Sequence, residues 1–154
     1  RDTSRKQGQP PMEEVISAQL KQRGARVKTV ELTPQAPLDD IRHIPQQGND
    51  YDYVFFNLFT VPNWGIGTLI PNKNAVRMFM FGLLSIKTPV IITAFGDPYS
   101  FYYCPAAPVF LCTFDESRAA QQAAVRAWLG ETPITGKMPV SLPGFFNKGD
   151  GLQL

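Results

Sequence analysis

The segment Pro89-Val-Ile-Ile-Thr-Ala-Phe-Gly-Asp-Pro-Tyr99 carries the strongest indication of the fold. Its first seven residues are apolar almost throughout, which is typical of a strand covered on both faces in a parallel sheet. Gly96 to Tyr99 then predicts a switch from strand to loop, because glycine and proline interrupt regular structure. The stretch therefore predicts a buried parallel strand that ends abruptly at its carboxyl end.

Strand and helix patterns alternate on both sides of this stretch. The other expected strands are Val27 to Leu32, exposed on one face, Tyr53 to Phe59, which should lie centrally, and Pro108 to Thr113. The expected helices are Met12 to Leu20 with Gly24 as its C-cap, Ala75 to Ile86, and Glu116 to Leu129, which Gly130 and Pro133 end. Pro34 to Asn49 is expected to be a loop with one helical turn, and Thr60 to Asn72 another loop.

This alternation predicts an α/β fold, a three-layer α/β/α sandwich with a mostly parallel sheet. Met138 to Leu142 is expected to be an edge strand near the C-terminus, since prolines flank it. Residues 1–154 are expected to form a single α/β domain. Arg1 to Gln9 is polar and lacks Met, so the chain is expected to be a fragment of a longer protein, and a first strand is expected to be missing.

Composition removes several classes of function. The 154 residues carry a net charge of +2, from 15 basic and 13 acidic side chains without a basic stripe, which argues against nucleic-acid binding. Apolar runs such as Met78 to Leu84 are far shorter than the ~20 residues that span a bilayer. Cys104 and Cys112 have no metal-ligand spacing, so they are expected to be buried thiols. Neither a cofactor nor a metal is expected.

Several separated segments resemble the C-terminal α/β domain of glycoside hydrolase family 3. The resemblance covers roughly residues 12 to 143 and is strongest from Thr88 onward. The residues that carry it are Gly96, Pro98 and Tyr99; Gln121, Gln122 and Ala123; Gly130 and Glu131; and the run Pro133-Ile-Thr-Gly-Lys-Met-Pro-Val-Ser-Leu-Pro143. Each piece alone is weak, but the set is specific.

The resemblance implies that catalysis lies elsewhere in the parent protein. Retaining glycosidases need two carboxyl groups about 5 Å apart, and in this family the nucleophilic Asp belongs to a TIM-barrel domain. The β-glucosidase branch takes its acid from a loop of the α/β domain, yet the comparable loop here, Asn57 to Asn72, has no Asp or Glu. The chain looks more like the β-N-acetylhexosaminidase branch, whose acid/base pair is on the barrel. No catalytic residue is therefore expected in this chain.

The resemblance also implies an origin, a location, a substrate and partners for the parent protein. The parent is expected to be a bacterial enzyme of the cell envelope, or a secreted one, that acts on N-acetylglucosamine in muropeptides or chitin fragments. The implied partners are the TIM barrel of the same protein and its carbohydrate substrate. A stand-alone binding or dimerisation module with the same fold is the alternative, and exposed aromatic residues would favour a homo-oligomer.

Asn57, Asn63 and Trp64 are the candidate substrate-binding residues. They follow a central strand at its carboxyl end, where open α/β sheets place ligands. Trp and amide side chains suit a sugar face, whereas packing between domains is the competing explanation.

Other motifs have plainer explanations. His43 lies near Asp39 and Asp40, which would allow a catalytic dyad, but a histidine in a proline-rich loop is more often a surface residue. Gly65-Ile-Gly67 lacks the third glycine of a dinucleotide fingerprint. Ser100 and Ser141 lack the nucleophile-elbow pattern of serine hydrolases.

Overall fold

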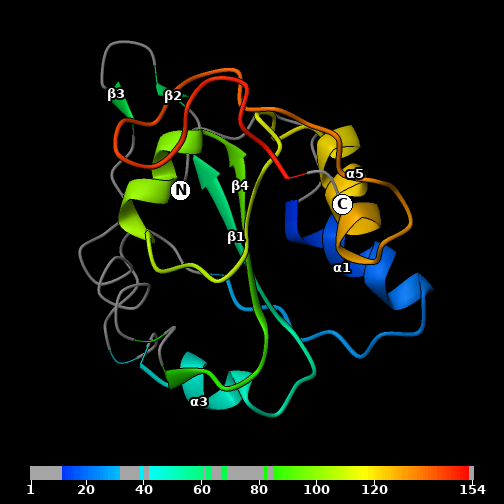
Figure 1. The fold of residues 1–154 in the computed structure, drawn as a ribbon. Coiled ribbons are helices and arrows are strands. Elements are labelled where there is room, and N and C mark those ends of the chain that lie inside the picture. The colour runs from blue at the N-terminus through cyan, green and yellow to red at the C-terminus, as the bar shows by residue number, and fades with distance from the viewer. Residues whose placement is uncertain are drawn as a thin grey trace. The chain divides into compact units, whose positions relative to one another are not determined.

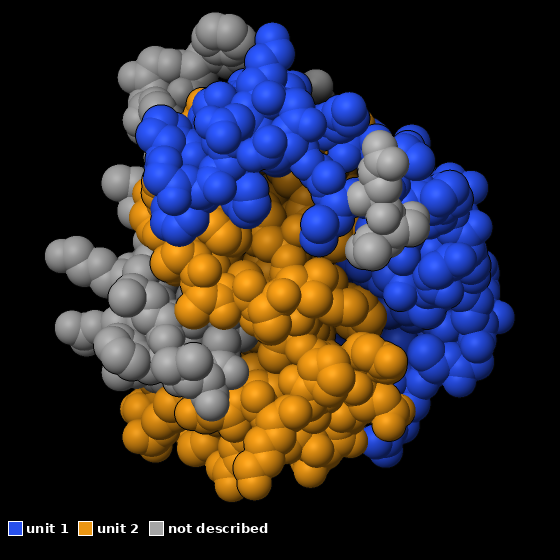
Figure 2. Space-filling view, in the orientation of Figure 1, with its two compact units in different colours: residues 1–31, 117–154 blue, residues 32–116 orange. Residues whose placement is uncertain are grey.

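The computed structural model describes residues 12–31, 39, 42–60, 62–63, 67–68, 82 and 85–152. The chain divides into two compact units, which Figure 2 shows in different colours. Unit 1 combines residues 1–31 with residues 117–154, whereas unit 2 is the continuous segment 32–116. Unit 1 is thus built from two segments that lie far apart in the sequence.

Within the described residues of unit 2, three strands form a parallel sheet in the order β1-β4-β5. These strands are β1 (Val54–Thr60), β4 (Val90–Gly96) and β5 (Phe110–Cys112) (Figure 1). The full length of β1 pairs with β4, from Val54 opposite Val90 to Thr60 opposite Gly96. Parallel pairing of strands separated by a long connection confirms the α/β fold expected from the sequence.

The apolar core of unit 2 lies on one face of this sheet. Alternate side chains of a strand point to the same face, and Phe56, Val90 and Ile92 are buried together with Cys104. Partly buried apolar residues pack around them: Ile44, Val54, Leu58, Ile86, Ala107 and Phe110. On the other face, the rings of Phe59 and Phe95 stack with centroids 4.7 Å apart and planes within 10°.

Two smaller elements complete the described part of unit 2. The helix α3 (Ile44–Gly48) supplies the single turn expected between residues 34 and 49, and Pro45 occupies its first turn, where the missing N–H is not needed. The strands β2 (Pro62–Asn63) and β3 (Gly67–Thr68) form an antiparallel pair.

Unit 1 contains two helices that contact each other, α1 (Met12–Gln22) and α5 (Arg118–Trp128). Both end as the sequence predicts, at a glycine with positive φ, Gly24 (84°) and Gly130 (69°). At each end the glycine N–H binds a carbonyl three residues back, and the next residue's N–H binds one five residues back. These paired bonds form the Schellman motif, which satisfies carbonyls that the helix leaves unpaired.

The last segment of unit 1, after α5, is held by backbone contacts between its two halves. The Met138 N–H donates to the Asp150 carbonyl at 2.7 Å, and the Gly149 N–H donates to the Met138 carbonyl at 2.8 Å. Leu142, which is almost fully buried, forms an isolated bridge with Phe146. Gly151 approaches Gly136 so closely that an added Cβ would lie 2.5 Å from the Gly136 carbonyl oxygen.

Gly151→Ala is therefore expected to destabilise the chain by about 1–3 kcal/mol, because the new methyl group would overlap backbone that has no flexible side chain to move. Urea unfolding followed by circular dichroism measures the change. Gly136→Ala is the matched control, since a Cβ there meets nothing within 4 Å. Equal stabilities of the two variants would contradict the close approach.

Three expectations about strands were wrong. β4, and not β1, is central among the described strands, because β4 pairs on both sides. Residues 27–31 of the strand expected at Val27 to Leu32 form no strand, and Val30 is exposed, so no apolar face exists to anchor a pairing. The edge strand expected at Met138 to Leu142 is not formed either. Pro139 lacks the N–H that a ladder requires, and the segment bonds instead with residues 146–150.

Most of the helix expected at Ala75 to Ile86 lies outside the described residues. The three-layer arrangement of helices over the sheet stays a prediction.

Candidate functional site at the carboxyl end of the sheet

The structure describes two of the three predicted binding residues, and these two lie in different sheets. Asn57 lies inside β1 opposite Thr93, within the strand expected at Tyr53 to Phe59 and not in the loop that follows it. Its side-chain oxygen Oδ1 is buried and has no hydrogen-bond partner in the described part of the chain. Asn63 belongs to β2, where it pairs with Gly67 in a separate sheet. Trp64 lies outside the described residues, so its role stays a prediction.

The carboxyl end of β4 carries an ordered polar turn. Gly96 has a φ of 113°, which lets the chain leave the strand sharply. Asp97 then caps the 3-10 helix η3 (Pro98–Tyr103), because its Oδ1 accepts a hydrogen bond of 2.9 Å from the Tyr99 N–H. The Ser100 hydroxyl donates to the Asp97 carbonyl at 2.7 Å. These bonds fix the backbone of the turn.

The second carboxylate oxygen of Asp97 is in an unusual position. Asp97 is only 6% exposed, and its Oδ2 has no hydrogen-bond partner among the residues that the structure describes. A buried carboxylate oxygen is stabilised by a donor, so this position favours a water or ligand hydroxyl.

The sequence of η3 separates buried from exposed side chains with a period of three. A 3-10 helix has three residues per turn, so side chains at i and i+3 share a face. Pro98 and Phe101 are buried, and the Phe101 ring contacts Phe110 edge to face at a centroid distance of 4.9 Å. Tyr99 and Tyr102 share the exposed face, where their rings lie within 3° of parallel at a centroid distance of 6.4 Å.

The end of β5 contributes a thiol and a strained backbone. Phe114 has a φ of 56°, a left-handed conformation that bulky residues rarely adopt. Burial raises the pKa of the Cys112 thiol to about 11; the Phe114 backbone N–H lowers it, and the Asp97 charge raises it. Burial likewise raises the pKa of Cys104 to about 11. Both cysteines are free, and neither is activated as a nucleophile.

The histidine region is at the surface. His43 is exposed and precedes α3 without capping it through its side chain. Its Nε2 accepts a long 3.4 Å hydrogen bond from the Arg42 guanidinium, and Arg42 forms an ion pair with Asp39 at 3.2 Å. Asp40 lies outside the described residues. The interpretation of His43 as a surface residue fits this geometry.

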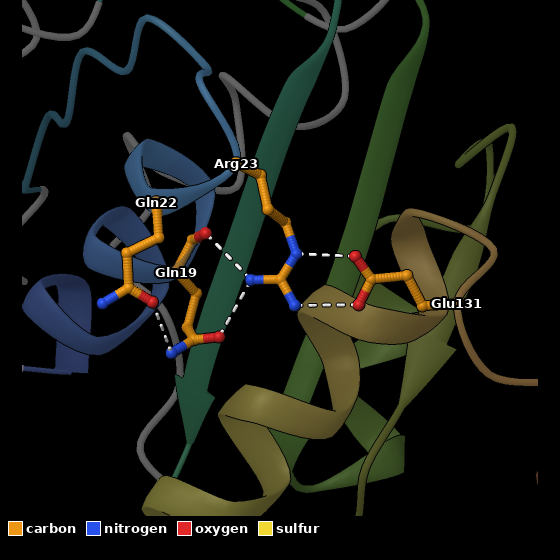
Figure 3. Close-up of polar contacts among 4 residues, drawn as sticks. All are labelled: Gln19, Gln22, Arg23 and Glu131. Atoms are coloured by element: carbon orange, nitrogen blue, oxygen red, sulfur yellow. Dashed lines mark hydrogen bonds and ion pairs between the residues drawn. The ribbon is translucent and has the colours of Figure 1, made fainter.

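In unit 1, a polar cluster joins α1 and the turn after it to Glu131, which lies three residues beyond the end of α5 (Figure 3). The Arg23 guanidinium donates to both carboxylate oxygens of Glu131, at 2.6 and 2.8 Å. Its third nitrogen donates to the backbone carbonyl and side-chain oxygen of Gln19, both at 3.0 Å. The hydrogen bond between Arg23 and Glu131 lowers the pKa of the Glu131 carboxyl group and raises the pKa of the Arg23 guanidinium. Glu131, which the family resemblance singles out, therefore has a structural role.

No group of three or more His, Cys, Asp or Glu side chains suited to a metal ion lies within the described ranges. No helix in those ranges is both apolar enough and long enough to cross a membrane.

The sequence reasoning missed Asp97 and the tyrosine pair as site residues. The available signal was Asp97-Pro98 at the end of a buried strand, since Asp at an N-cap followed by Pro at the first helical position marks a helix start. The exposed pairing of Tyr99 with Tyr102 depends on the 3-10 period, which a loop prediction does not supply.

Comparison with known proteins gives one informative similarity. No family model matches the sequence, and no curated protein matches it. A solved structure similar to this chain comes from a fungal multi-domain GH3 beta-N-acetylglucosaminidase, described as having a unique GCN5-related glucosamine N-acetyltransferase region. The TM-score is 0.68 at 20% identity, over 91% of this chain and 15% of the other. The fold of this chain thus occurs within a GH3 protein.

At 20% identity this similarity shows the fold alone, and the chain spans only a small part of the other protein. The α/β prediction is confirmed, and the association of the fold with a GH3 β-N-acetylglucosaminidase agrees with the resemblance noted from the sequence.

Proposed function

We propose that this chain is an accessory α/β domain of a glycoside hydrolase family 3 enzyme of the β-N-acetylhexosaminidase type, packed on a TIM barrel that carries out catalysis. The observation that supports this proposal is the match of 91% of the chain to part of a GH3 β-N-acetylglucosaminidase. The segment from Pro133 to Pro143 resembles the closing segment of the GH3 α/β domain. For this reason we assign the chain to the hydrolase part of such a protein and not to an acetyltransferase region.

The acidic residues with short hydrogen bonds support an accessory role, because each has a structural partner. Asp97 caps η3, Glu131 binds Arg23, and Asp150 accepts a hydrogen bond from the Asn147 N–H at 2.8 Å. Retaining glycosidases instead hold two carboxyl groups about 5 Å apart around the scissile bond. The parent's bacterial origin, its location in the envelope or outside the cell, and a contribution of Asn57, Asn63 and Trp64 to the sugar cleft belong to the same proposal.

The isolated chain is expected to hydrolyse aryl β-N-acetylglucosaminide no faster than buffer, whereas the complete polypeptide encoded by its gene is expected to turn it over. Expressing that polypeptide with and without residues 1–154 tests both halves of the proposal. We expect removal of the domain either to raise KM or to abolish folding of the barrel. Circular dichroism of the truncated protein distinguishes these two outcomes.

A gene product without any hydrolase domain would overturn the proposal and favour the stand-alone binding or dimerisation module. Light scattering on the 154-residue chain then decides between these two, since a dimerisation module must show twice the monomer mass. Turnover by the isolated chain that disappears in a single Asp or Glu variant would equally overturn the accessory role.

A further inference from the structure

We propose that Tyr99 and Tyr102 form a carbohydrate-binding platform, on which a β-linked N-acetylglucosamine oligosaccharide stacks. The binding surface follows from the geometry of η3, and only the identity of the sugar rests on the proposed function. This platform is distinct from the predicted site at Asn57, Asn63 and Trp64.

The two rings lie parallel to each other, and both are partly accessible. Tyr99 and Tyr102 are 45% and 42% exposed, and their ring planes differ by only 3°. Pyranose rings present C–H groups on one face and hydroxyls at the edge. A tyrosine matches both features, because its ring is apolar and its hydroxyl is polar.

The platform is rigid before any ligand arrives. The Asp97 carboxylate holds the Tyr99 backbone, and the Cys104 N–H donates to the Phe101 carbonyl at 2.9 Å, which closes the end of η3. Phe101 anchors the same turn against Phe110 on β5. A rigid pair of aromatic rings loses little conformational entropy when it binds, so more of the contact energy is available for affinity.

The sequence that follows Asp97 favours a neutral ligand. From Pro98 to Phe114 the sequence has no Asp, Glu, Lys or Arg. Phosphate groups, nucleic acids and lipid headgroups are bound mainly by cationic side chains, which this stretch does not offer. A neutral sugar needs only ring faces and hydrogen-bonding groups. The platform also follows the carboxyl end of the central strand β4, the end of a parallel sheet at which ligands usually bind.

The test is titration of the 154-residue chain with chitotetraose (β-1,4-linked N-acetylglucosamine tetramer), followed by calorimetry and tyrosine fluorescence. We expect saturable binding that Tyr99→Ala or Tyr102→Ala each weakens by about tenfold. Tyr99→Phe and Tyr102→Phe keep the rings and should stay within a few-fold of the native affinity. Circular dichroism confirms that the variants remain folded.

Tyr53→Ala is the matched control. Tyr53 is 58% exposed, belongs to the same unit, and precedes the first residue of β1 at the amino end of the sheet. Its replacement should leave chitotetraose affinity unchanged. Equal affinities of the native chain and both platform alanine variants would overturn the proposal, as would absence of binding at millimolar chitotetraose.

Self-association of the chain that is lost in Tyr99→Ala without any sugar binding would also overturn it, by assigning the rings to a protein interface. Because the titration needs no barrel, it can fail while the parent gene still encodes a GH3 hydrolase. The sugar site and the proposed function are therefore tested separately.

Discussion

Replacing Phe95 with alanine is expected to destabilise the chain by about 3–5 kcal/mol, because it removes a fully buried ring from the central strand. Phe95 has no exposed surface, and its ring stacks on Phe59 of the neighbouring strand. Truncation would leave a cavity that strands on both sides of β4 cannot close without breaking their pairing. Urea unfolding followed by circular dichroism measures the loss, and we expect the variant to unfold at a much lower urea concentration than the native chain.

Phe145→Ala is the control for this substitution, since it removes the same ring from a position that is 45% exposed. We expect its midpoint to fall much less than that of Phe95→Ala. Similar losses for the two variants would show that burial in the sheet does not determine the effect.

Raising the pH from 8 to 10 is expected to destabilise the chain by about 1 kcal/mol for each of two thiols, the buried Cys104 and the partly buried Cys112. Burial raises the pKa of Cys104 and of Cys112 to about 11 in the folded chain, above the ordinary value of 9. Below about pH 8 both thiols are protonated in the folded and unfolded states, and stability is fully retained. Between pH 9 and 11 the unfolded thiols ionise while the folded ones do not, so stability is lost as pH rises.

The Cys104→Ala/Cys112→Ala double variant isolates this effect from the titration of lysine and tyrosine. Under reducing conditions, we expect its unfolding free energy to decrease less between pH 8 and 10 than that of the native chain. Parallel pH profiles would show that neither thiol is protected from ionisation in the folded state.

The strongest local patterns were enough to predict the main elements. The apolar run ending at Phe95 became β4, and the glycines at positions 24 and 130 end α1 and α5 as expected. These features depend on burial and on local backbone geometry. Both are indicated by residue types within a short segment, such as a run of apolar residues or a glycine at the end of a helix. The parallel sheet followed from their alternation along the chain.

Strand order and the site depend on contacts that local patterns do not contain. The apolar runs of β1 and β4 look equally buried in the sequence, and only the pairing of β4 with β5 makes β4 central. Asn57 lies within a strand because its neighbours continue the pairing with β4. Pairing Tyr99 with Tyr102 requires the 3-10 period, and finding an Asp97 oxygen without a partner among the described residues requires the position of every neighbouring donor.

The Arg23–Glu131 pair has a consequence for how the chain folds while it is being made. Its two residues are 108 positions apart in the sequence. The helix α1 precedes the continuous segment of unit 2 along the chain, and α5 follows it. A ribosome adding roughly 5–20 residues per second needs about 5–20 s to complete α5 after α1 has been made. An isolated helix as short as α1 is marginally stable in water. During that delay unit 2 can fold first, and the apolar face of α1 stays accessible to chaperones until α5 has been synthesised.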